Sequence, residues 1–481
     1  MQLSPVLNIL GLLATILAAA MFIPMCVDLY LGSSDWHIFA LSALLTGFVG
    51  VSIWLATSRR EALDLGLRQA FLLTNGSWVM IGIFGALPFM FSELNLSLTD
   101  SVFESISGIT TTGSTVLVEI EKASPGILIW RALLQWLGGV GIVVMAMAVL
   151  PMLSVGGMQL FRTESYESAE KVVPRATQLA GGIGLVYTAL TALWAMMLTF
   201  SGMDVFDAVA HSMTTLATGG YSTRTASIGA FDSVVIEWVI IAGMIVGSLP
   251  FAHYLAMVRG GWRGLLHDPQ VRWFLILIFG LVLMLCWHLM QNGLGLGEAI
   301  RQASFNGVSI ITGTGYVSAN FSAWGGFATT ILLIVMFIGG CGGSTTCGIK
   351  VFRLQVLAGT VKVQISRLLR PHAVVLAYYN KRPVSGEVMD SVMGFFYLYI
   401  LGFIVIALFL GMTGLDFVTA LSGAATSISN VGPGLGGVIG AEGNFSSVPD
   451  SAKWVMSFAM ILGRLEIFTL LVLFTPIFWQ K

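Results

Sequence analysis

The stretch SVFESISGITTTGST (101–115) is the first of four related segments; the others are AVAHSMTTLATGGYS (208–222), ASFNGVSIITGTGYV (303–317) and ALSGAATSISNVGPG (420–434). Aligned without a gap, they share a glycine column made of Gly113, Gly220, Gly315 and Gly432. Six positions earlier stands a hydroxyl column, made of Ser107, Thr214, Ser309 and Thr426. Twelve positions earlier stand small residues, namely Ser101, Ala208, Ala303 and Ala420. Columns that stay in phase over four copies predict an internal repeat.

Each segment is too short to cross a bilayer and too polar to face lipid. Irregular backbone at membrane depth is tolerated only where it is buried in protein or lines a wet cavity. Four re-entrant segments around one axis would point helix C-termini and backbone carbonyls at a dehydrated cation. The alternative is four outer loops with helix-packing glycines, but that alternative leaves the hydroxyl and small-residue columns unexplained. The absence of a charged side chain near each glycine favours a monovalent cation over calcium.

The rest of the chain has the composition of a membrane protein. Hydrophobic residues make up 56% of the sequence and charged residues only 10%, against about 25% charged in an ordinary soluble domain. Long apolar runs predict about ten spans, at 6–31, 36–57, 70–92, 127–151, 179–201, 233–258, 271–291, 326–349, 391–413 and 452–478. The first run lacks a basic start and a cleavage site, so we expect a retained helix rather than a signal peptide.

Basic residues alternate between the loops in a way that predicts orientation. Most of the 23 Lys and Arg residues fall in every second loop, and such loops stay in the cytoplasm. Both termini are then cytoplasmic, and the outer loops are rich in acids, which concentrate cations or merely solubilise the loops. With a net charge of −1, no basic field indicates nucleic acid. The four cysteines have no metal-ligand spacing.

The predicted fold is therefore an all-α polytopic membrane protein with four pseudo-symmetric helix–pore loop–helix repeats around one pore, preceded by an extra helical pair. The predicted units are a two-helix extension at 1–68 and four pore repeats at 69–177, 178–268, 269–385 and 386–481. No nucleophile–base arrangement is visible, so we expect no enzyme.

A glycine-rich run, GGCGGSTTCG (339–348), interrupts the last apolar span of the third repeat. Each glycine inside a helix costs about 1 kcal/mol, so the helix should break there. A phosphate loop is excluded because Ile349 separates Gly348 from Lys350 and no strand precedes the run. We expect a mobile loop inside the membrane, lining or closing the pathway; a close-packed helix crossing is the alternative.

Arg464 stands ten residues into the last predicted span, with Glu466 two positions later. A mid-helix Arg in a membrane costs roughly 2.5–3.5 kcal/mol, so its side chain should face a cavity or a partner. Positions two apart point away from each other on a helix, so we do not expect Glu466 to be that partner. A structural ion pair is the alternative to a role in the pathway.

These residues resemble the bacterial Trk/Ktr-type potassium-uptake family, and specifically its Trk-type membrane subunit. The resemblance covers nearly the whole chain and rests on ITTTGST, LLQWLGGVGIVVMAMAVLP (133–151), IGGCGGSTTCGIK (338–350), SNVGPG and GRLEIFTLL (463–471). The first two spans look like the extra helical pair of the Trk branch.

The resemblance implies a potassium filter and a gate. The filter residues implied are Thr111, Thr112, Gly113, Thr218, Gly219, Gly220, Gly313, Thr314, Gly315, Asn430, Val431 and Gly432. The gating residues implied are Gly339, Gly340, Gly342, Gly343, Ser344, Thr345, Thr346, Gly348 and Arg464, with the Arg as an electrostatic barrier below the filter. The degenerate signature around each glycine suggests fewer or less equal ion sites, and less strict selection against sodium.

The resemblance also implies the surroundings of the chain. It implies a bacterial inner-membrane location, a homodimer, and a cytosolic Trk-associated nucleotide-binding regulatory subunit. No covalent cofactor is implied; potassium is the substrate, and a nucleotide (ATP/ADP or NAD) acts only through the regulatory partner. Coupling to protons or sodium, as in a symporter, stays open. The competing hypotheses are an alternating-access carrier for a small solute and a less selective monovalent cation transporter.

Overall fold

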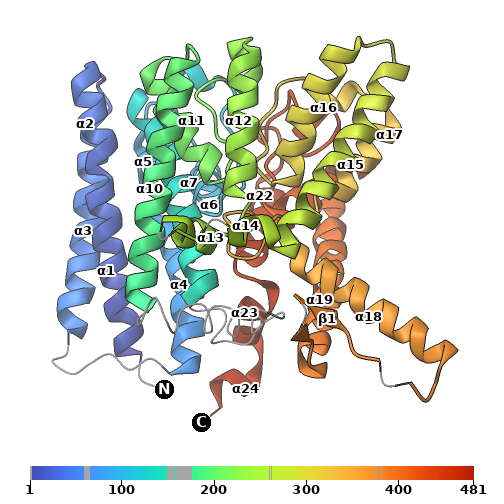
Figure 1. The fold of residues 1–481 in the computed structure, drawn as a ribbon. Helices are drawn as coiled ribbons and strands as arrows, with labels where there is room; N and C mark the ends of the chain where they lie inside the picture. Colours follow the sequence, from blue (N-terminus) through green and yellow to red (C-terminus); the bar gives the residue numbers. More distant parts are fainter. Residues whose placement is uncertain are drawn as a thin grey trace.

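The computed structural model describes residues 3–58, 66–148, 157, 176–258, 260–261, 263–373, 375–380 and 382–480. Within these ranges the chain is a bundle of long helices around short, centrally placed ones (Figure 1). Several basic residues of the predicted inner loops lie outside the described residues, namely Arg59, Arg60, Arg162, Lys171, Arg175, Arg259, Lys381 and Lys481, as does the end of the predicted first pore repeat.

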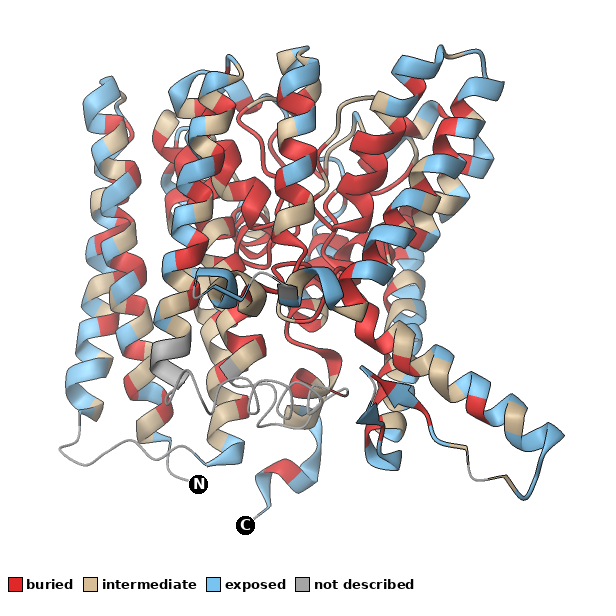
Figure 2. Cartoon of the chain, viewed as in Figure 1, coloured by how far each residue is buried: buried red, intermediate tan, exposed pale blue. Residues whose placement is uncertain are grey.

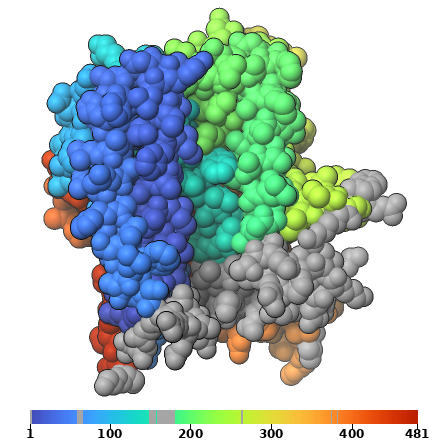
Figure 3. All heavy atoms as spheres, turned by 90° about the vertical axis from the view of Figure 1, so that its left-hand side faces the viewer, coloured from blue at the N-terminus to red at the C-terminus, as the bar shows by residue number. Residues whose placement is uncertain are grey.

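An N-terminal group of helices precedes the first repeat. It consists of α1 (Ser4–Ala20), α2 (Phe22–Leu31) and α3 (Trp36–Thr57). Figure 3 shows this group, in blue, laid along one flank of the molecule. Helix α1 packs on α4, and α2 packs on α7. The group therefore covers the first repeat from outside and takes no part in the centre.

Each of the four repeats has a long outer helix, a short buried helix and a returning helix. The first contains α4 (Leu67–Phe84), α5 (Leu87–Phe91), α6 (Leu98–Ile109), the 3₁₀ turn η1 (Ile120–Lys122) and α7 (Pro125–Ala148). The second contains α10 (Ala176–Phe200), α11 (Val205–Leu216), η2 (Ser227–Phe231), α12 (Val234–Gly247), α13 (Phe251–Val258) and α14 (Arg263–His267).

The third and fourth repeats follow the same order and add elements at the end near both chain termini (Figure 1). The third contains α15 (Pro269–Gln291), α16 (Leu296–Ile311), η3 (Phe321–Ala323), α17 (Gly326–Val335), α18 (Val351–Leu369) and the antiparallel strands β1 (Tyr378–Tyr379) and β2 (Arg382–Pro383). The fourth contains α19 (Gly386–Met412), α20 (Phe417–Ser429), α21 (Gly436–Ile439), α22 (Asp450–Arg464), α23 (Ile467–Leu471), η4 (Val472–Phe474) and α24 (Pro476–Trp479).

Burial confirms that the bundle is built for lipid. Figure 2 shows buried residues gathered in the centre and exposed ones on the outside. Many exposed residues are large and apolar, such as Phe48, Leu185, Phe279 and Leu408, whereas a soluble monomer rarely exposes large apolar patches. Seven helices among the described residues are long and apolar enough to cross a membrane, or up to nine if each bent pair is one span.

Three predicted spans are bent or interrupted rather than straight helices. The run 233–258 is bent by 94° between α12 and α13, and the run 452–478 is bent by 113° after α22. In the predicted span 326–349 the helix α17 is only ten residues long and ends before the glycine-rich run. The expected break in the third repeat is thus present. Arg464, expected in mid-helix, is instead the last residue of α22.

Candidate functional site

The four short buried helices α6, α11, α16 and α20 all point their C-termini into the centre and end in the same way. The residue two places before each column glycine is left-handed, with φ of 53° at Thr111, 50° at Thr218, 66° at Gly313 and 53° at Asn430. The next N–H donates back to the carbonyl of the hydroxyl-column residue at 2.9–3.0 Å, from Thr112 to Ser107, Gly219 to Thr214, Thr314 to Ser309 and Val431 to Thr426. This is the Schellman closure of a helix, repeated four times.

The column glycines then take a second left-handed conformation, with φ of 88° at Gly113, 78° at Gly220, 81° at Gly315 and 109° at Gly432. A Cβ on each would meet a carbonyl oxygen of the next segment. The distance would be 2.2 Å from Gly113 to Gly219 O, 1.9 Å from Gly220 to Thr314 O, 2.0 Å from Gly315 to Val431 O and 2.7 Å from Gly432 to Thr112 O. The contacts run from the first segment to the fourth and back to the first, so we call these four glycines and four carbonyls the glycine ring.

The contact between the fourth and first segments closes the glycine ring and has extra hydrogen bonds. The Ser114 hydroxyl donates to Gly432 O at 2.7 Å, and the Asn430 amide donates to the Thr112 hydroxyl at 2.8 Å. Further out, the Phe445 N–H donates to Thr115 O at 2.9 Å. We call this contact the seam.

The hydroxyl-column side chains have different hydrogen-bond partners in the four repeats. In the first and third, Ser107 and Ser309 donate to the carbonyl that follows the column glycine, at 2.6 and 2.7 Å. In the second, the Thr214 hydroxyl lies 2.5 Å from Tyr316 OH. In the fourth, the Thr426 hydroxyl is buried without a hydrogen-bond partner among the described residues. The shared feature of the column is therefore its backbone carbonyl.

Two tyrosines tie neighbouring segments together, and the sequence comparison missed them. Tyr221 follows the second column glycine and donates to Glu104 O of the first segment at 2.8 Å. Tyr316 follows the third and reaches His211 O of the second at 3.3 Å. Both accepting carbonyls lie nine places before a column glycine. The sequence does contain a signal for these tyrosines, because a Tyr directly follows the column glycine in both the second and the third segment.

One carbonyl of the glycine ring also accepts a side-chain donor. Gln135 of α7 donates from Nε2 to Gly219 O at 2.6 Å, and its Oε1 accepts from the Tyr221 N–H at 3.1 Å. Gln135 is fully buried. This clamp is specific to the second segment among the hydrogen bonds of the described residues.

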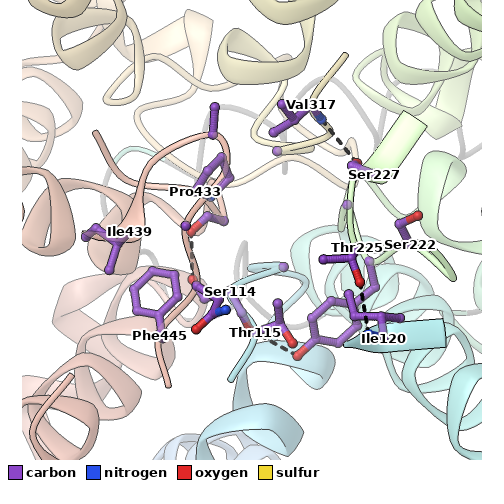
Figure 4. Close-up of a pocket in the computed structure, with 18 of the residues that line it drawn as sticks. Ser114, Thr115, Ile120, Ser222, Thr225, Ser227, Val317, Pro433, Ile439 and Phe445 are labelled. Atoms are coloured by element: carbon purple, nitrogen blue, oxygen red, sulfur yellow. Dashed lines mark hydrogen bonds between the residues drawn. The ribbon is translucent and has the colours of Figure 1, made fainter. Parts of the chain in front are cut away.

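A cavity of about 70 Å³, which we call the mouth, is lined by all four column glycines (Figure 4). Arg131 and Arg224 line it as well, but each is paired with an acid, Arg131 with Glu104 at 2.8 Å and Arg224 with Asp207 at 2.6 Å. Arg131 is only 1% exposed, so its pairing with Glu104 is buried. The pairing cancels two positive charges where a cation would enter.

An acid beside the mouth keeps its charge. Glu121 accepts hydrogen bonds from the backbone N–H and the hydroxyl of Thr225. Burial acts to raise the pKa of Glu121, but the bonds from Thr225, a bond from its own backbone and the nearby Arg224 charge together lower that pKa. The carboxylate is therefore ionised at neutral pH.

Behind the glycine ring the glycine-rich run forms a loop whose two ends lie side by side. The Ile349 N–H donates to Phe337 O at 2.8 Å, and the Gly339 N–H donates to Ile349 O at 2.9 Å. All the loop residues implied for gating lie between these ends. The loop fills the bend after α12, where the Cys341 N–H donates to Ser248 O at 3.0 Å.

Thr345 joins this loop to the second segment. Its hydroxyl lies 2.8 Å from Gly247 O and 3.1 Å from Leu216 O, and it accepts from the Thr218 hydroxyl at 3.1 Å. Thr218 is the left-handed residue of the second segment. The loop therefore touches the backbone that shapes the glycine ring.

Arg464 reaches the same loop from the fourth repeat. Its Nη1 donates to Thr345 O at 3.0 Å, its Nη2 donates to Gly138 O of α7 at 3.1 Å, and the side chain also contacts the Cys347 sulfur. Arg464 is 2% exposed, and no carboxylate of the described residues pairs with it. Glu466 pairs instead with Arg353 at 2.5 Å. A cation at a helix C-terminus is favoured by the helix dipole, which offsets part of its burial.

A second glycine column was missed because its spacing varies. Gly138, Gly247 and Gly463 sit on the returning helices of repeats one, two and four. A Cβ there would meet the last-turn carbonyl of the same repeat's short helix, at 1.8 Å from Ile109 O, 2.9 Å from Leu216 O and 1.9 Å from Ile428 O. These glycines let the returning helices approach the buried segments.

Comparisons with known proteins agree with this geometry. The TrkH family model, a cation transport protein family, matches residues 36–481. The Trk system potassium uptake protein TrkI of Halomonas elongata is 43% identical over 99% of this chain and 97% of its own length. TrkH of Escherichia coli K12 is 38% identical over the full length of both. The crystal structure of the potassium transporter TrkH from Vibrio parahaemolyticus matches with a TM-score of 0.92 at 36% identity, covering 100% of both chains. The expected resemblance is confirmed, and the chain belongs to the TrkH family of cation transport proteins.

Proposed function

We propose that this chain takes up potassium across the bacterial inner membrane through a channel-like pathway whose selectivity filter is the glycine ring. The observation that carries the proposal is the closed order of contacts from Gly113 through Gly220 and Gly315 to Gly432. Its relatives are potassium uptake proteins, which supports potassium as the cargo. Two successive left-handed positions in each segment alternate the backbone direction, so that carbonyls can replace the water around a cation.

The Schellman closures give the filter its rigidity. Each carbonyl of the glycine ring belongs to a residue whose N–H is already bonded to the preceding helix, so binding an ion requires little new ordering. The four helix C-termini add partial negative charge. The residues implied as filter carry no carboxylate, and a monovalent ion suits such a site.

The glycine-rich loop and Arg464 form the proposed gate. Hydrogen bonds hold the loop from several sides, among them the Cys341 N–H to Ser248 O, the Gly342 N–H to Gln270 Oε1 and Arg464 Nη1 to Thr345 O. Removing the Arg464 side chain would loosen one of these sides, since a net hydrogen bond contributes about 1 kcal/mol. The Arg charge, unpaired by any acid of the described residues, repels cations from the inner side.

We propose the following orientation and assembly for the chain. Both termini face the cytoplasm, the chain acts as a homodimer, and a cytosolic nucleotide-binding subunit regulates it. We propose that the chain is organised as the five units expected from the sequence, the N-terminal helical pair followed by four pore repeats. No catalytic role is proposed.

Proteoliposome flux tests the filter directly. Purified full-length protein should pass potassium and rubidium faster than sodium and lithium, and expression should restore growth at low potassium in a strain that lacks its own uptake systems. Equal flux of all four ions would refute the selective filter. Failure to restore growth, with the protein shown in the membrane, would refute potassium uptake itself.

The two bent helix pairs support a second candidate, an alternating-access carrier, because carriers use broken helices at their sites. Current measurements separate the two functions. A channel-like pathway gives flux that rises with the potassium gradient without coupling, whereas a carrier saturates and stops when the coupled proton or sodium gradient is removed.

A further inference from the structure

A second pocket lies where α15 begins, between α15, α18 and β1, and shares no lining residue with the cavity at the glycine ring. It has a volume of about 300 Å³ and is lined by Pro269 and Trp273 of α15, Gln355 and Lys362 of α18, and Tyr378 of β1. Since α15 is a membrane span that starts at Pro269, the pocket opens at the level where that span leaves the bilayer.

The aromatic residues of this pocket suit a membrane surface. Trp273 is 43% exposed and Tyr378 is 61% exposed. Trp and Tyr gather at the boundary between membrane and water, where an apolar ring and a polar tip are both satisfied. A pocket that served only the protein interior would bury both rings.

Helix α18, which forms one wall of the pocket, carries only basic charges. It contains Arg353, Lys362 and Arg367 and no acidic residue; Arg353 is buried and paired with Glu466, whereas Lys362 and Arg367 are exposed. Lys362 lines the pocket, is exposed, and pairs with no carboxylate of the described residues. An anionic group is therefore the matching ligand.

The helix that carries Lys362 also has an apolar face turned outward. Val361, Ile365, Leu368 and Leu369 are 50%, 54%, 82% and 78% exposed, and their spacing places them on one side of α18. Helix α18 thus combines an apolar side with a basic one, the pattern of a helix that lies in the membrane interface.

We propose that this pocket binds the headgroup of an anionic phospholipid, with Lys362 facing its phosphate and the apolar side of α18 resting among the acyl chains. The continuity of pocket and apolar side on one helix favours a lipid over an acidic protein, which would match the charges but not the exposed leucines. Because α18 follows the glycine-rich loop in the chain, a bound lipid would fix the position of its far end.

The test is lipid binding by the purified full-length protein, followed by native mass spectrometry with added phosphatidylglycerol or phosphatidylcholine. Phosphatidylglycerol should be retained in preference, and Lys362→Ala should weaken its retention about fivefold, the effect of one lysine near an anionic membrane. Arg367→Ala is the matched control: it removes an equal charge from another side of the same helix and should change retention less. Lys362→Arg should restore it.

Three results would overturn the proposal. Equal retention by Lys362→Ala and the parent protein would remove the site, and displacement of the lipid by millimolar inorganic phosphate would make it a site for the free anion. A change of oligomer mass in Leu368→Gln with lipid retention unchanged would make the apolar side a protein contact. None of these readouts uses ion flux, so failure here is distinct from failure of the proposed potassium pathway.

Discussion

The outer and inner halves of the four repeats differ in how much symmetry they keep. At the glycine ring the backbone repeats four times, with the same two left-handed positions and the same closing hydrogen bond. One level further in, α7 continues unbroken, α12 bends by 94°, α17 stops before a loop, and α22 bends by 113°. Coordinating one ion from all sides requires equal contributions, whereas closing a pathway requires only one movable part. Under the proposed function, symmetry is therefore retained at the proposed filter and lost at the proposed gate.

Breaking the symmetric half should have the largest effect. In Gly220→Ala the new Cβ would lie 1.9 Å from Thr314 O. In Gly432→Ala the new Cβ would lie 2.7 Å from Thr112 O, which is a milder clash. We expect Gly220→Ala to reduce potassium flux at least a hundredfold, and Gly432→Ala to retain more of it, as measured in proteoliposomes. Gly280→Ala, on a lipid-facing helix with open space around it, is the control. An equal loss of potassium flux in Gly220→Ala and Gly432→Ala would show that the distance from the new Cβ to the neighbouring carbonyl does not determine how well each substitution is tolerated.

Breaking the asymmetric half should raise flux instead of abolishing it. Arg464→Ala removes the bonds to Thr345 O and Gly138 O together with an unpaired charge. We expect potassium flux to rise several-fold in Arg464→Ala. The flux of Arg464→Lys should lie between those of Arg464→Ala and the parent protein, because Lys keeps the charge but cannot make both hydrogen bonds. Unchanged flux at normal expression would contradict the barrier role.

One side chain introduces asymmetry into the symmetric half, and its removal sharpens the comparison. Gln135→Leu frees Gly219 O from its amide donor, which leaves that carbonyl more negative toward an ion. We expect the ratio of potassium to sodium flux to change by a few-fold while the protein stays folded, as judged by thermal unfolding. If only the unfolding temperature changes, Gln135 is a structural clamp and not a determinant of selectivity.

The smallest expected effect compares two equivalent bonds. Tyr221→Phe and Tyr316→Phe each remove one hydroxyl that ties adjacent segments. Each should lower stability by about 1 kcal/mol, with Tyr316→Phe the more costly because it also leaves the Thr214 hydroxyl without its 2.5 Å partner. Thermal unfolding in detergent measures both. A large loss for one variant alone would mean that the two ties are not equivalent.

The repeats could be predicted because a left-handed backbone position beside a close neighbour restricts the residue to glycine, and that restriction is visible in the sequence. Gly113 and its three counterparts could be aligned since no other residue fits there without a clash. Straight apolar spans such as 36–57 were predicted to the residue. The break in the third repeat was also predicted, because glycine content alone makes a helix costly there.

The rest depends on contacts that local composition does not encode. Bends after Gly247 and Arg464 occur inside apolar runs, so hydropathy reads each as one span. Arg131 and its partner Glu104 are 27 residues apart and are brought together only by folding. The second glycine column escaped alignment because the loops before Gly138, Gly247 and Gly463 differ in length. The filter and gate assignments remain predictions to be tested by flux.

The seam has a consequence for how the protein is made. It joins Ser114 to Gly432, positions 318 residues apart, so the first and last repeats must meet before the ring of contacts is complete. A chain still emerging from the ribosome holds three of the four walls and no closed conduit. Under the proposed function, the filter is therefore incomplete until the fourth repeat has been made and has folded against the first, whereas an assembly of four identical subunits completes its filter only by oligomerising.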